Sequence, residues 1–228
     1  MSTDTVPCPQ PVPGKAPRAR LLDAGCELFC RHGFHAVGVD AIVEAAGTAK
    51  ATLYKIFGSK EALVEAVLER EGREWREWFL GGLDAGEASA RDRLDRIMPL
   101  LTEWFASARF YGCPFINAVG EHDKSDDRMR RLALAHKAAV LARIEALAAE
   151  AGAAEPATLS HQIGILIDGA IVAALVTRNP EVGRTAGLTL AGLLDAKLAG
   201  ARRPAIRPSR PRTARSRPAT LTRRSSAS

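Results

Sequence analysis

A short run of amine and hydroxyl side chains in the first quarter of the chain has the chemistry of a phosphate-binding surface. Lys50 and Lys55 supply positive charge, and the hydroxyls of Thr52 and Tyr54 can donate hydrogen bonds to phosphate oxygens. Lys60 follows at the expected start of the next helix, where we expect it to hold a DNA phosphate. Each lysine taken singly could be a solvated surface charge, and Tyr54 could be a core aromatic with only its hydroxyl exposed. The run as a whole predicts contact with the DNA backbone and with base edges.

Two short helical segments position this run. Apolar residues recur with a helical period over residues 39–46, Gly47 interrupts that period, and a second short helix is expected over residues 49–57. Leu53 and Phe57 lie on the inner side of the second helix. Two short helices joined by a glycine-containing turn are typical of a helix-turn-helix. The residues predicted to contact DNA are Thr48, Ala49, Lys50, Ala51, Thr52, Tyr54, Lys55 and Lys60.

Helices are also predicted on both sides of the motif and through most of the remaining chain. Residues 18–32 form an amphipathic helix with Asp23 and Glu27 on its polar side, and another helix runs from Lys60 to about Leu80. A break is expected at Gly81, Gly82 and Gly86, followed by helices over 90–108, near 114–121, and over 125–151, 157–178 and 182–199. The fold class is therefore predicted to be all-α.

The charge of the chain is concentrated in its last residues. The formal net charge is +6, but residues 201–228 hold nine arginines and no acid, so residues 1–200 are net negative, at about −3. The folded part is therefore not a bulk polyanion binder, and DNA contact must come from a small local surface. The arginine-rich tail either adds non-specific phosphate affinity or is a solvated, disordered end.

No pattern in the chain indicates a catalytic or metal site. A glycine-rich phosphate loop, paired catalytic carboxylates and a nucleophile elbow are absent from the sequence, and its histidines are scattered, so we predict that the protein is not an enzyme and has no cofactor. The cysteines form no CxxC pair, which disfavours a metal site and a disulfide framework. They are Cys8, Cys26, Cys30 and Cys113.

The sequence also favours a cytoplasmic protein. Residues 1–15 are polar and proline-rich, lack the apolar core of a signal peptide and are expected to be a disordered arm. The longest apolar stretch, residues 163–176, is short for a bilayer span and is interrupted by Asp168. We therefore expect no membrane segment.

The helix-turn-helix and its flanks resemble the TetR family of bacterial transcriptional regulators. The resemblance covers about residues 18–68, roughly a quarter of the chain. It is carried by Leu28-Phe29, Gly33-Phe34, Val39, Ile42, Ala46-Gly47, Thr52-Leu53-Tyr54, Phe57, Ser59-Lys60-Glu61 and Leu63. Family members often carry Ser or Thr where this chain has Gly38, and Ser then Gly where it has Ala49 and Ala51. The missing hydroxyl at Ala49 puts one phosphate contact in doubt, and Thr48 is a candidate to replace it.

The resemblance implies that the C-terminal helices form a dimer and enclose an effector pocket. The last two long helices carry more apolar residues than one monomer face needs, together with small residues that allow close approach. We therefore expect a two-fold dimer packed as a four-helix bundle. Its predicted interface residues are Ile163, Ile167, Ile171, Leu190 and Leu194.

Aromatic residues concentrate in the middle of the chain, as an apolar ligand cavity would require. Such residues at helical spacing can equally be ordinary core. The predicted pocket residues are Trp75, Trp78, Trp104, Phe105, Phe110, Cys113, Phe115, Asn117, His161 and Asp168. Cys113 is interpreted as a buried structural thiol, with a redox sensor as the alternative. Asp168 lies two helical turns from His161 on the same face. A carboxylate there is expected to form a polar pair, to bind water at the dimer seam, or to recognise an effector.

The sequence thus predicts an all-α regulator with an N-terminal three-helix DNA-binding domain and a larger helical domain. The expected divisions are an arm over 1–15, the DNA-binding domain over 16–62, the effector-binding and dimerisation domain over 63–200, and a disordered tail over 201–228. As the resemblance implies, we expect a homodimeric repressor that binds a pseudo-palindromic double-stranded operator and is released by a small molecule.

Overall fold

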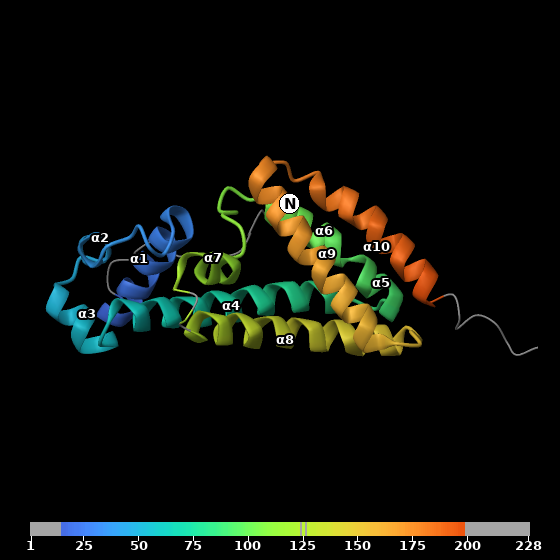
Figure 1. The fold of residues 1–228 in the computed structure, drawn as a ribbon, viewed down its shortest axis with the longest axis horizontal. Coiled ribbons are helices and arrows are strands. Elements are labelled where there is room, and N and C mark those ends of the chain that lie inside the picture. Colours follow the sequence, from blue (N-terminus) through green and yellow to red (C-terminus); the bar gives the residue numbers. More distant parts are fainter. Residues whose placement is uncertain (1–14, 124, 126, 199–228) are drawn as a thin grey trace, which may run out of the picture.

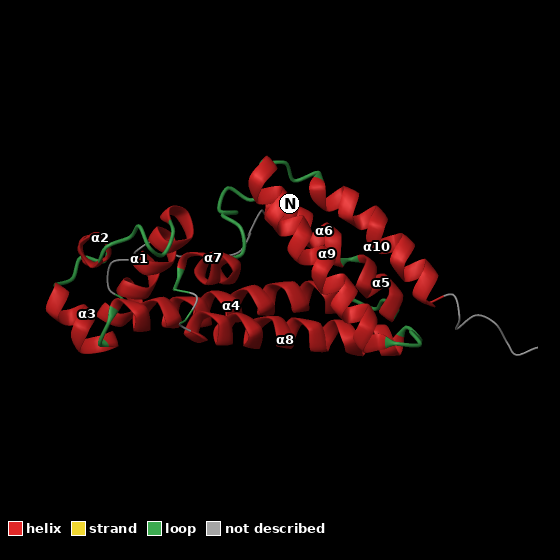
Figure 2. Cartoon of the chain, in the orientation of Figure 1, coloured by secondary structure: helices red, strands yellow, loops and turns green. Residues whose placement is uncertain are grey.

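The computed structural model describes residues 15–123, 125 and 127–198. In these ranges the chain consists of helices and connecting loops, without strands (Figures 1 and 2). The helices are α1 (Pro17–His32), α2 (Val39–Ala45), α3 (Lys50–Phe57), α4 (Lys60–Asp84), α5 (Ala90–Asp95), α6 (Ile97–Phe105), α7 (Pro114–Glu121), α8 (Asp127–Glu150), α9 (Pro156–Thr177) and α10 (Val182–Leu198). The all-α prediction is confirmed. The arginine-rich tail and residues 1–14 of the expected arm lie outside the described residues.

Helices α1, α2 and α3 form a small head around the first turns of α4 (Figure 1). Leu21, Ile42, Leu53 and Leu63, one from each helix, are 0% exposed and form the centre of its core. The turn between α2 and α3 contains Gly47 with φ 56°, a left-handed conformation that glycine adopts without steric cost. The head is therefore the three-helix arrangement that the sequence predicts.

Helix α4 runs from the head into the larger helical body, so the expected boundary between residues 62 and 63 falls inside a continuous helix. The break predicted at Gly81 and Gly82 is wrong, because α4 continues through both glycines to Asp84. A Cβ atom on Gly82 would lie 2.8 Å from a methyl carbon of Leu100. This glycine therefore serves the close packing of a neighbouring helix.

The single helix predicted over residues 90–108 is two helices, α5 and α6, which meet at Arg96. Pro99 explains the interruption, because it has no N–H to donate to the carbonyl of Asp95 and its ring clashes with a continuous helix there. Ser89 begins α5 with a capping box, in which its side chain and that of Asp92 each bond the other's backbone N–H.

Helices α8, α9 and α10 pack with α5 and α6 into the body's core. The apolar run expected to be too short for a bilayer belongs to the longer helix α9, which by length and composition alone could cross one. Core helices of water-soluble proteins pass the same test, and α9 contacts α6, α8 and α10. Its Leu159, Ile163 and Ala174 are at most 2% exposed.

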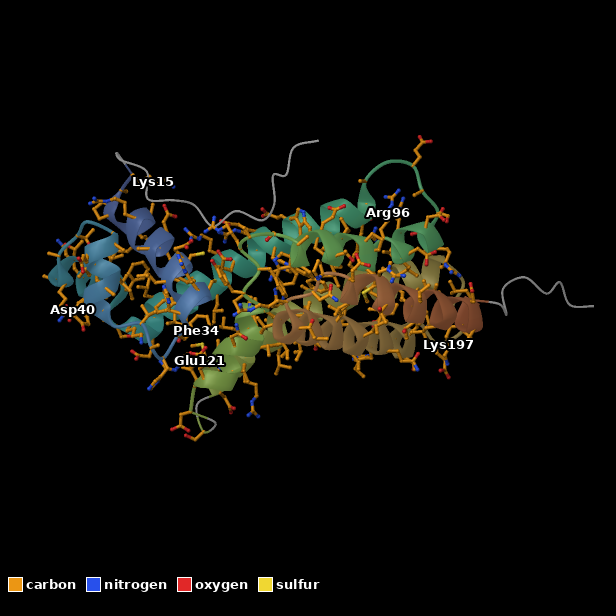
Figure 3. The ribbon with its side chains drawn as sticks, turned by 90° about the horizontal axis from the view of Figure 1, so that it is seen from above. Lys15, Phe34, Asp40, Arg96, Glu121 and Lys197 are labelled. Carbon is orange, nitrogen blue, oxygen red and sulfur yellow. The ribbon has the colours of Figure 1, made fainter. Side chains whose placement is uncertain are left out.

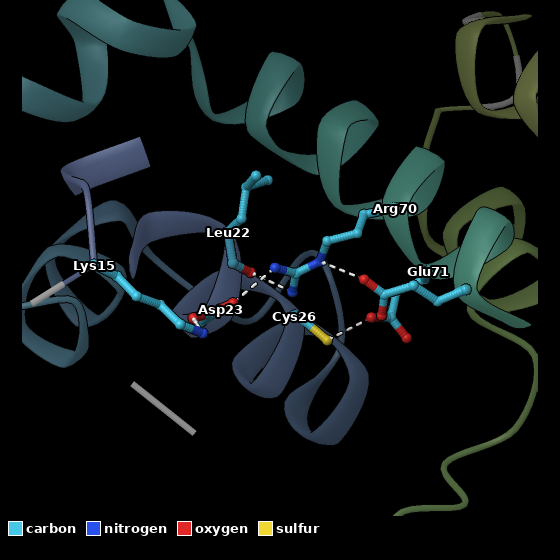
Figure 4. A network of polar contacts seen from close by, with 7 residues as sticks. Lys15, Leu22, Asp23, Cys26, Arg70 and Glu71 are labelled. Atoms are coloured by element: carbon cyan, nitrogen blue, oxygen red, sulfur yellow. Dashed lines mark hydrogen bonds and ion pairs between the residues drawn. The ribbon is translucent and has the colours of Figure 1, made fainter. Parts of the chain in front are cut away.

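A buried ionic network joins α1 to α4 (Figure 4). Asp23, which the sequence pattern places on the polar side of its helix, is only 2% exposed. Its carboxylate accepts from Arg70 Nη1 at 2.7 Å and from Lys15 Nζ at 2.9 Å. Arg70 Nη2 also donates to the carbonyl of Leu22 at 3.1 Å. The network therefore fixes the head on α4.

Candidate DNA-binding face and internal cavity

Helix α3 presents most of the predicted DNA contacts to solvent. Leu53 anchors it at 0% exposure, while Ala49, Lys50, Ala51, Tyr54 and Lys55 are exposed. Tyr54 is 48% exposed, so its ring is not a core aromatic in this structure. Ala49 begins α3 without a side-chain hydrogen bond to the first turn. Backbone N–H groups at such a helix start are suited to a phosphate oxygen.

Lys50 has a carboxylate partner in the DNA-free protein. Its Nζ lies 2.7 Å from Asp40 Oδ1 on α2, and the hydrogen bond to Asp40 raises the pKa of Lys50. The two side chains are 53% and 81% exposed. Ion pairs this exposed contribute little, so Lys50 can exchange Asp40 for a phosphate at small cost.

Three of the predicted contacts are less exposed than the others. Thr48, Thr52 and Lys60 are half-buried. The hydroxyl oxygen of Thr48 is buried and has no hydrogen-bond partner among the described residues. Lys60 Nζ lies 5.9 Å from the centre of the Phe29 ring. The next residue before it, Ser59, caps α4 by accepting from Ala62 N at 3.0 Å.

An internal cavity of about 90 Å³ lies where the head meets the body. Its polar and ionisable lining consists of Glu27, Cys30, Glu71, Arg109, Tyr111, Cys113, His136, Lys137 and Asp168. Trp75, Trp104, Gly112, Pro114, Phe115, Val140, Ile167 and Ile171 complete its walls. Helices α1, α4, α6, α7, α8 and α9 therefore all contribute to this internal cavity, together with the loop before α7.

Half of the predicted pocket residues line the internal cavity: Trp75, Trp104, Cys113, Phe115 and Asp168. Phe105, Phe110 and Asn117 instead line a second, more open hollow, which shares Cys30 and Tyr111 with the internal cavity. Trp78 and His161 line neither. Trp78 packs its ring against Phe79 and Trp75.

Of the alternatives left open for Asp168, a pair with His161 is the one that the structure excludes. Asp168 is held by Lys137 of α8, whose Nζ lies 2.5 Å from Oδ1. His161 is exposed and its Nδ1 lies 2.8 Å from the carbonyl of Ala157, in its own helix. Seven residues span about 10 Å of helix, so sharing a face with Asp168 does not bring His161 to the same site.

Two ionisable groups of the cavity have strongly shifted pKa values. Burial raises the pKa of Glu71 to about 7, partly offset by the nearby Arg70 guanidinium. Burial lowers the pKa of His136 to about 3, and Arg76 and Lys137 lower it further. His136 is therefore neutral at pH 7, with Nδ1 accepting from Arg76 Nη1 at 3.0 Å. Its ring stacks on Phe115 with centroids 4.2 Å apart.

The thiols at the cavity are in unreactive surroundings. Burial raises the pKa of Cys30 to about 12 and also raises that of Cys113. Because the thiolate is the reactive form, the structure favours the buried structural interpretation of Cys113. Cys30 also lies near Cys26 and Glu71, with the three potential ligand atoms within 4.8 Å of one another. Cys26 is disulfide-bonded and so has no thiol to ionise. A metal ligand must lose its proton, which the high pKa of Cys30 also opposes, and the absence of a metal site stays a prediction.

The polar residues of the cavity were mostly missed by sequence reasoning. Glu27 lies on the polar side of α1, which the pattern assigned to solvent, and Arg109 pairs with it at 2.6 Å across 82 residues. Lys137 and His136 lie in a helix whose amphipathic pattern is weak. One signal was present: Glu71 and Trp75 are four residues apart and share a face of α4.

The residues predicted for the dimer interface lie in the protomer's own core. Ile163, Ile167, Ile171, Leu190 and Leu194 are at most 6% exposed. Their stripe was correctly identified as apolar, but α6, α8 and the opposing helix already cover it. The large apolar residues of α9 and α10 that are exposed are Ile165, Val172, Leu175, Val176 and Leu188, at 37–76% exposure. We call Ile165, Val172 and Val176 the outer apolar face, because their spacing places them on one side of α9.

The end of α7 touches the head directly. Glu121 Oε2 accepts from the backbone N–H of His35 at 2.9 Å, in the loop after α1. The rings of Phe34 and His122 lie 6.2 Å apart, and Figure 3 shows Phe34 and Glu121 side by side at this junction. The body therefore contacts the head through α7 as well as through α4.

Comparison with known proteins gives one consistent result. Residues 21–67 match the family described as bacterial regulatory proteins, tetR family. A TetR-family transcriptional regulator from Streptomyces coelicolor is 29% identical and superposes over 80% of this chain and 96% of its own, with a TM-score of 0.73. A TetR transcriptional regulator from Streptomyces avermitilis is 30% identical over 80% of this chain and 98% of its own, with a TM-score of 0.71.

Relatives found by sequence match part of the chain. A helix-turn-helix transcriptional regulator of Mycobacterium tuberculosis is 36% identical over 99 residues, 40% of this chain. The match spans about half the length of that relative, 49%. Shorter stretches of the chain are similar to the activator FasR of Mycolicibacterium smegmatis, at 47% identity over 53 residues, and to the repressor ComR of Escherichia coli, at 38% identity over 73 residues.

Proposed function

The chain belongs to the TetR family of bacterial regulatory proteins, and on that premise we propose that it is a homodimeric, ligand-responsive repressor. It binds a pseudo-palindromic operator through α3, and a small molecule in the internal cavity lowers its affinity for that operator. Its relatives are transcriptional regulators rather than enzymes. Both an activator and a repressor occur among them. The proposal of repression therefore depends on how a ligand in the internal cavity would move α3 away from DNA.

One observation carries the proposal: the helices that hold α3 in place also form walls of the internal cavity. Glu27 and Cys30 come from α1, and Glu71 and Trp75 come from α4. Both helices pack against α3 in the head. A ligand that widens the cavity by displacing α1 or α4 therefore also moves α3. Such a ligand weakens DNA binding by its preference for the displaced arrangement.

The α7 junction supports the same coupling. Glu121 holds the loop that follows α1, and Phe115 at the other end of α7 lines the cavity. A ligand against Phe115 therefore acts on a helix of eight residues whose far end touches the head. The repressed state corresponds to the unliganded structure, in which α3 is free to enter the major groove.

Dimerisation is proposed through the outer apolar face of α9 and neighbouring residues of α10. Val176 is 76% exposed, Ile165 is 73% exposed and Leu188 of α10 is 68% exposed. Exposed apolar residues gathered on the last two helices are typical of a protein–protein interface. A two-fold dimer with recognition helices one DNA turn apart, about 34 Å, would match a pseudo-palindromic site.

The test is DNA binding at several salt concentrations, measured by fluorescence anisotropy with DNA from upstream of the protein's own gene. Lys55→Ala removes one proposed phosphate contact in each protomer. The slope of log affinity against log salt should then fall by about 1.8, since each lost phosphate contact changes it by about 0.9. Lys197→Ala is the control, because Lys197 lies at the far end of the molecule (Figure 3).

The proposal fails if the full-length protein binds no such fragment at moderate salt. An unchanged slope for Lys55→Ala, equal to that of Lys197→Ala, would remove α3 from the DNA contact. A small molecule that binds in the internal cavity should lower the affinity of the unmodified protein for the DNA fragment without changing its oligomeric state.

A further inference from the structure

We propose that the internal cavity selects a small organic cation, an ammonium group on an apolar body, with Glu71 as its counter-ion. The inference rests on the proposed function only in taking the internal cavity as the effector site. It deepens that function by naming the chemical class of the effector.

The charges that line the cavity are compensated, except for one carboxyl group. Arg109 lies 2.6 Å from Glu27, and Lys137 lies 2.5 Å from Asp168. Glu71 has no ion pair within 4 Å in the described ranges, although it lines the same space. With His136 neutral and the other ionisable side chains Glu27, Glu71, Arg109, Lys137 and Asp168 charged, the lining carries one net negative charge. Glu71 is half-buried, and a carboxylate taken partly out of water without an ion-pair partner is unfavourable, so a bound cation would reduce that cost.

The surroundings of Glu71 bring the pKa of its carboxyl group close to neutral pH. The charged and titratable groups that act on it, contact it or line the cavity with it are Glu27, Cys26 and Cys30 from α1, Arg70 and Glu74 from α4, Arg109 from the loop before α7, His136 and Lys137 from α8, and Asp168 from α9. Cys26 Sγ lies 2.8 Å from Glu71 Oε1 (Figure 4). Burial is the largest effect on Glu71 and raises its pKa to about 7. The group can therefore ionise near neutral pH when a cation arrives.

Aromatic rings surround the space next to Glu71. Trp75, one turn along α4, meets Trp104 edge-on with centroids 5.6 Å apart. Tyr111 and Phe115 lie on the other walls. Aromatic faces attract ammonium ions through their quadrupoles, most strongly when water is excluded. The same rings accept the apolar body of the ligand.

An unsatisfied polar atom in the same wall points to a ligand that also accepts a hydrogen bond. Trp75 Nε1 is buried and has no hydrogen-bond partner in the described part of the chain. Buried donors are ordinarily paired. A ligand that carries an oxygen acceptor near its ammonium group would satisfy Trp75 and Glu71 together, one turn apart on one helix.

Charge selection has a signature in the pH dependence of binding. A cation stabilises the ionised form of Glu71, so below pH 7 its binding expels a proton from the carboxyl. Affinity for the cation should therefore rise from pH 6 to pH 8 and then level. A neutral ligand of the same shape gains nothing from ionisation, and its affinity should stay constant or fall over that range.

The experiment is isothermal titration of the full-length protein, without DNA, using benzylammonium and benzyl alcohol as probes. The two differ only in the ammonium and hydroxyl groups. At pH 8 we expect benzylammonium to bind about tenfold more tightly, the order of a charge-assisted hydrogen bond. Glu71→Gln should abolish that preference. Glu77→Gln on the same helix should preserve it, because Glu77 is exposed and does not line the cavity.

Proton release is measured on the unmodified protein by repeating the titration at pH 6 in two buffers of different ionisation enthalpy. This keeps the test decisive if Glu71→Gln does not fold. Equal affinities of the two probes, no proton release, an unchanged preference in Glu71→Gln, or no binding of either probe would each overturn the inference. Because these measurements contain no DNA, failure here leaves operator binding by α3 untouched, and failure of operator binding leaves these titrations interpretable.

Discussion

Replacing Asp23 tests how the DNA-binding head is held on α4. Asp23 is 2% exposed and accepts from Arg70 at 2.7 Å and from Lys15 at 2.9 Å. Arg70 is itself only 12% exposed, so Asp23→Ala leaves a buried guanidinium without its carboxylate. Breaking a buried ion pair from one side costs about 3–5 kcal/mol. Arg70 retains Leu22 O at 3.1 Å and Glu74 at 3.9 Å, so we expect the lower end, about 3 kcal/mol.

The assay is thermal and urea unfolding at one fixed protein concentration, because dimerisation would couple stability to concentration. For a chain of this size, a loss of 1 kcal/mol lowers Tm by about 2–4 °C. Asp23→Ala should therefore lower Tm by about 6–12 °C and weaken operator binding, since α1 supports α3. The operator measurement must be made well below the new Tm.

Asp84→Ala is the matched control. Asp84 also bridges two arginines, lying 3.8 Å from Arg93 and in contact with Arg143, but its side chain is 42% exposed. Exposed ion pairs contribute about 0–1 kcal/mol, so this variant should lose less than about 1 kcal/mol. Equal losses in Asp23→Ala and Asp84→Ala would refute the argument that burial makes the α1–α4 network the stronger one.

Three further outcomes are expected. Val176→Asp should convert the dimer to a monomer in sedimentation experiments without lowering helix content, and a dimer that persists would exclude this part of α9 from the interface. The pKa of His136 is lowered when the protein folds, so its contribution to stability is complete above pH 6.5 and is lost as pH falls towards 3. Relative to His136→Gln, the free energy of unfolding should fall by at most about 1.4 kcal/mol per pH unit in that window, and parallel pH profiles would contradict this. In α10, Gly183→Ala should destabilise the protein, because the new Cβ would lie 2.1 Å from a threonine hydroxyl of α6. A Cβ at Gly192 meets no atom within 4 Å, so Gly192→Ala should stabilise the protein by up to about 1 kcal/mol. Urea unfolding that ranks the two variants the other way would show that the packing argument fails.

The head could be predicted from the sequence because its signals are local. The helical period over residues 39–46, the glycine at 47 and the inward Leu53 all act within a few residues of one another, and the structure confirms each. The exposed position of Lys55 follows from the same periodicity. Which of these residues contact DNA stays a prediction.

The internal cavity could be predicted only in part. Trp75, Trp104 and Phe115 were found because large aromatic residues are scarce and gather in one region. Phe105 and Phe110 share that composition but face a different hollow. Helical spacing gives the inward side of one helix, and it carries no information about which neighbouring helix that side will meet.

The sequence by itself determined most of the helices, their apolar stripes and the helix-turn-helix, because these depend on periods of three or four residues and on local glycine, proline and capping residues. It did not determine where α4 ends or that α5 and α6 are separate. Only the tertiary structure decided the partners of the charged groups and the outer side of α9. Asp23 meets Arg70 across 47 residues, and Lys137 meets Asp168 across 31. Such pairs depend on how helices cross, which the pattern within each helix does not specify. Because of the same packing, Glu71 is the carboxyl group of the cavity lining that has no ion pair in the described ranges, and this determines the net charge of the internal cavity.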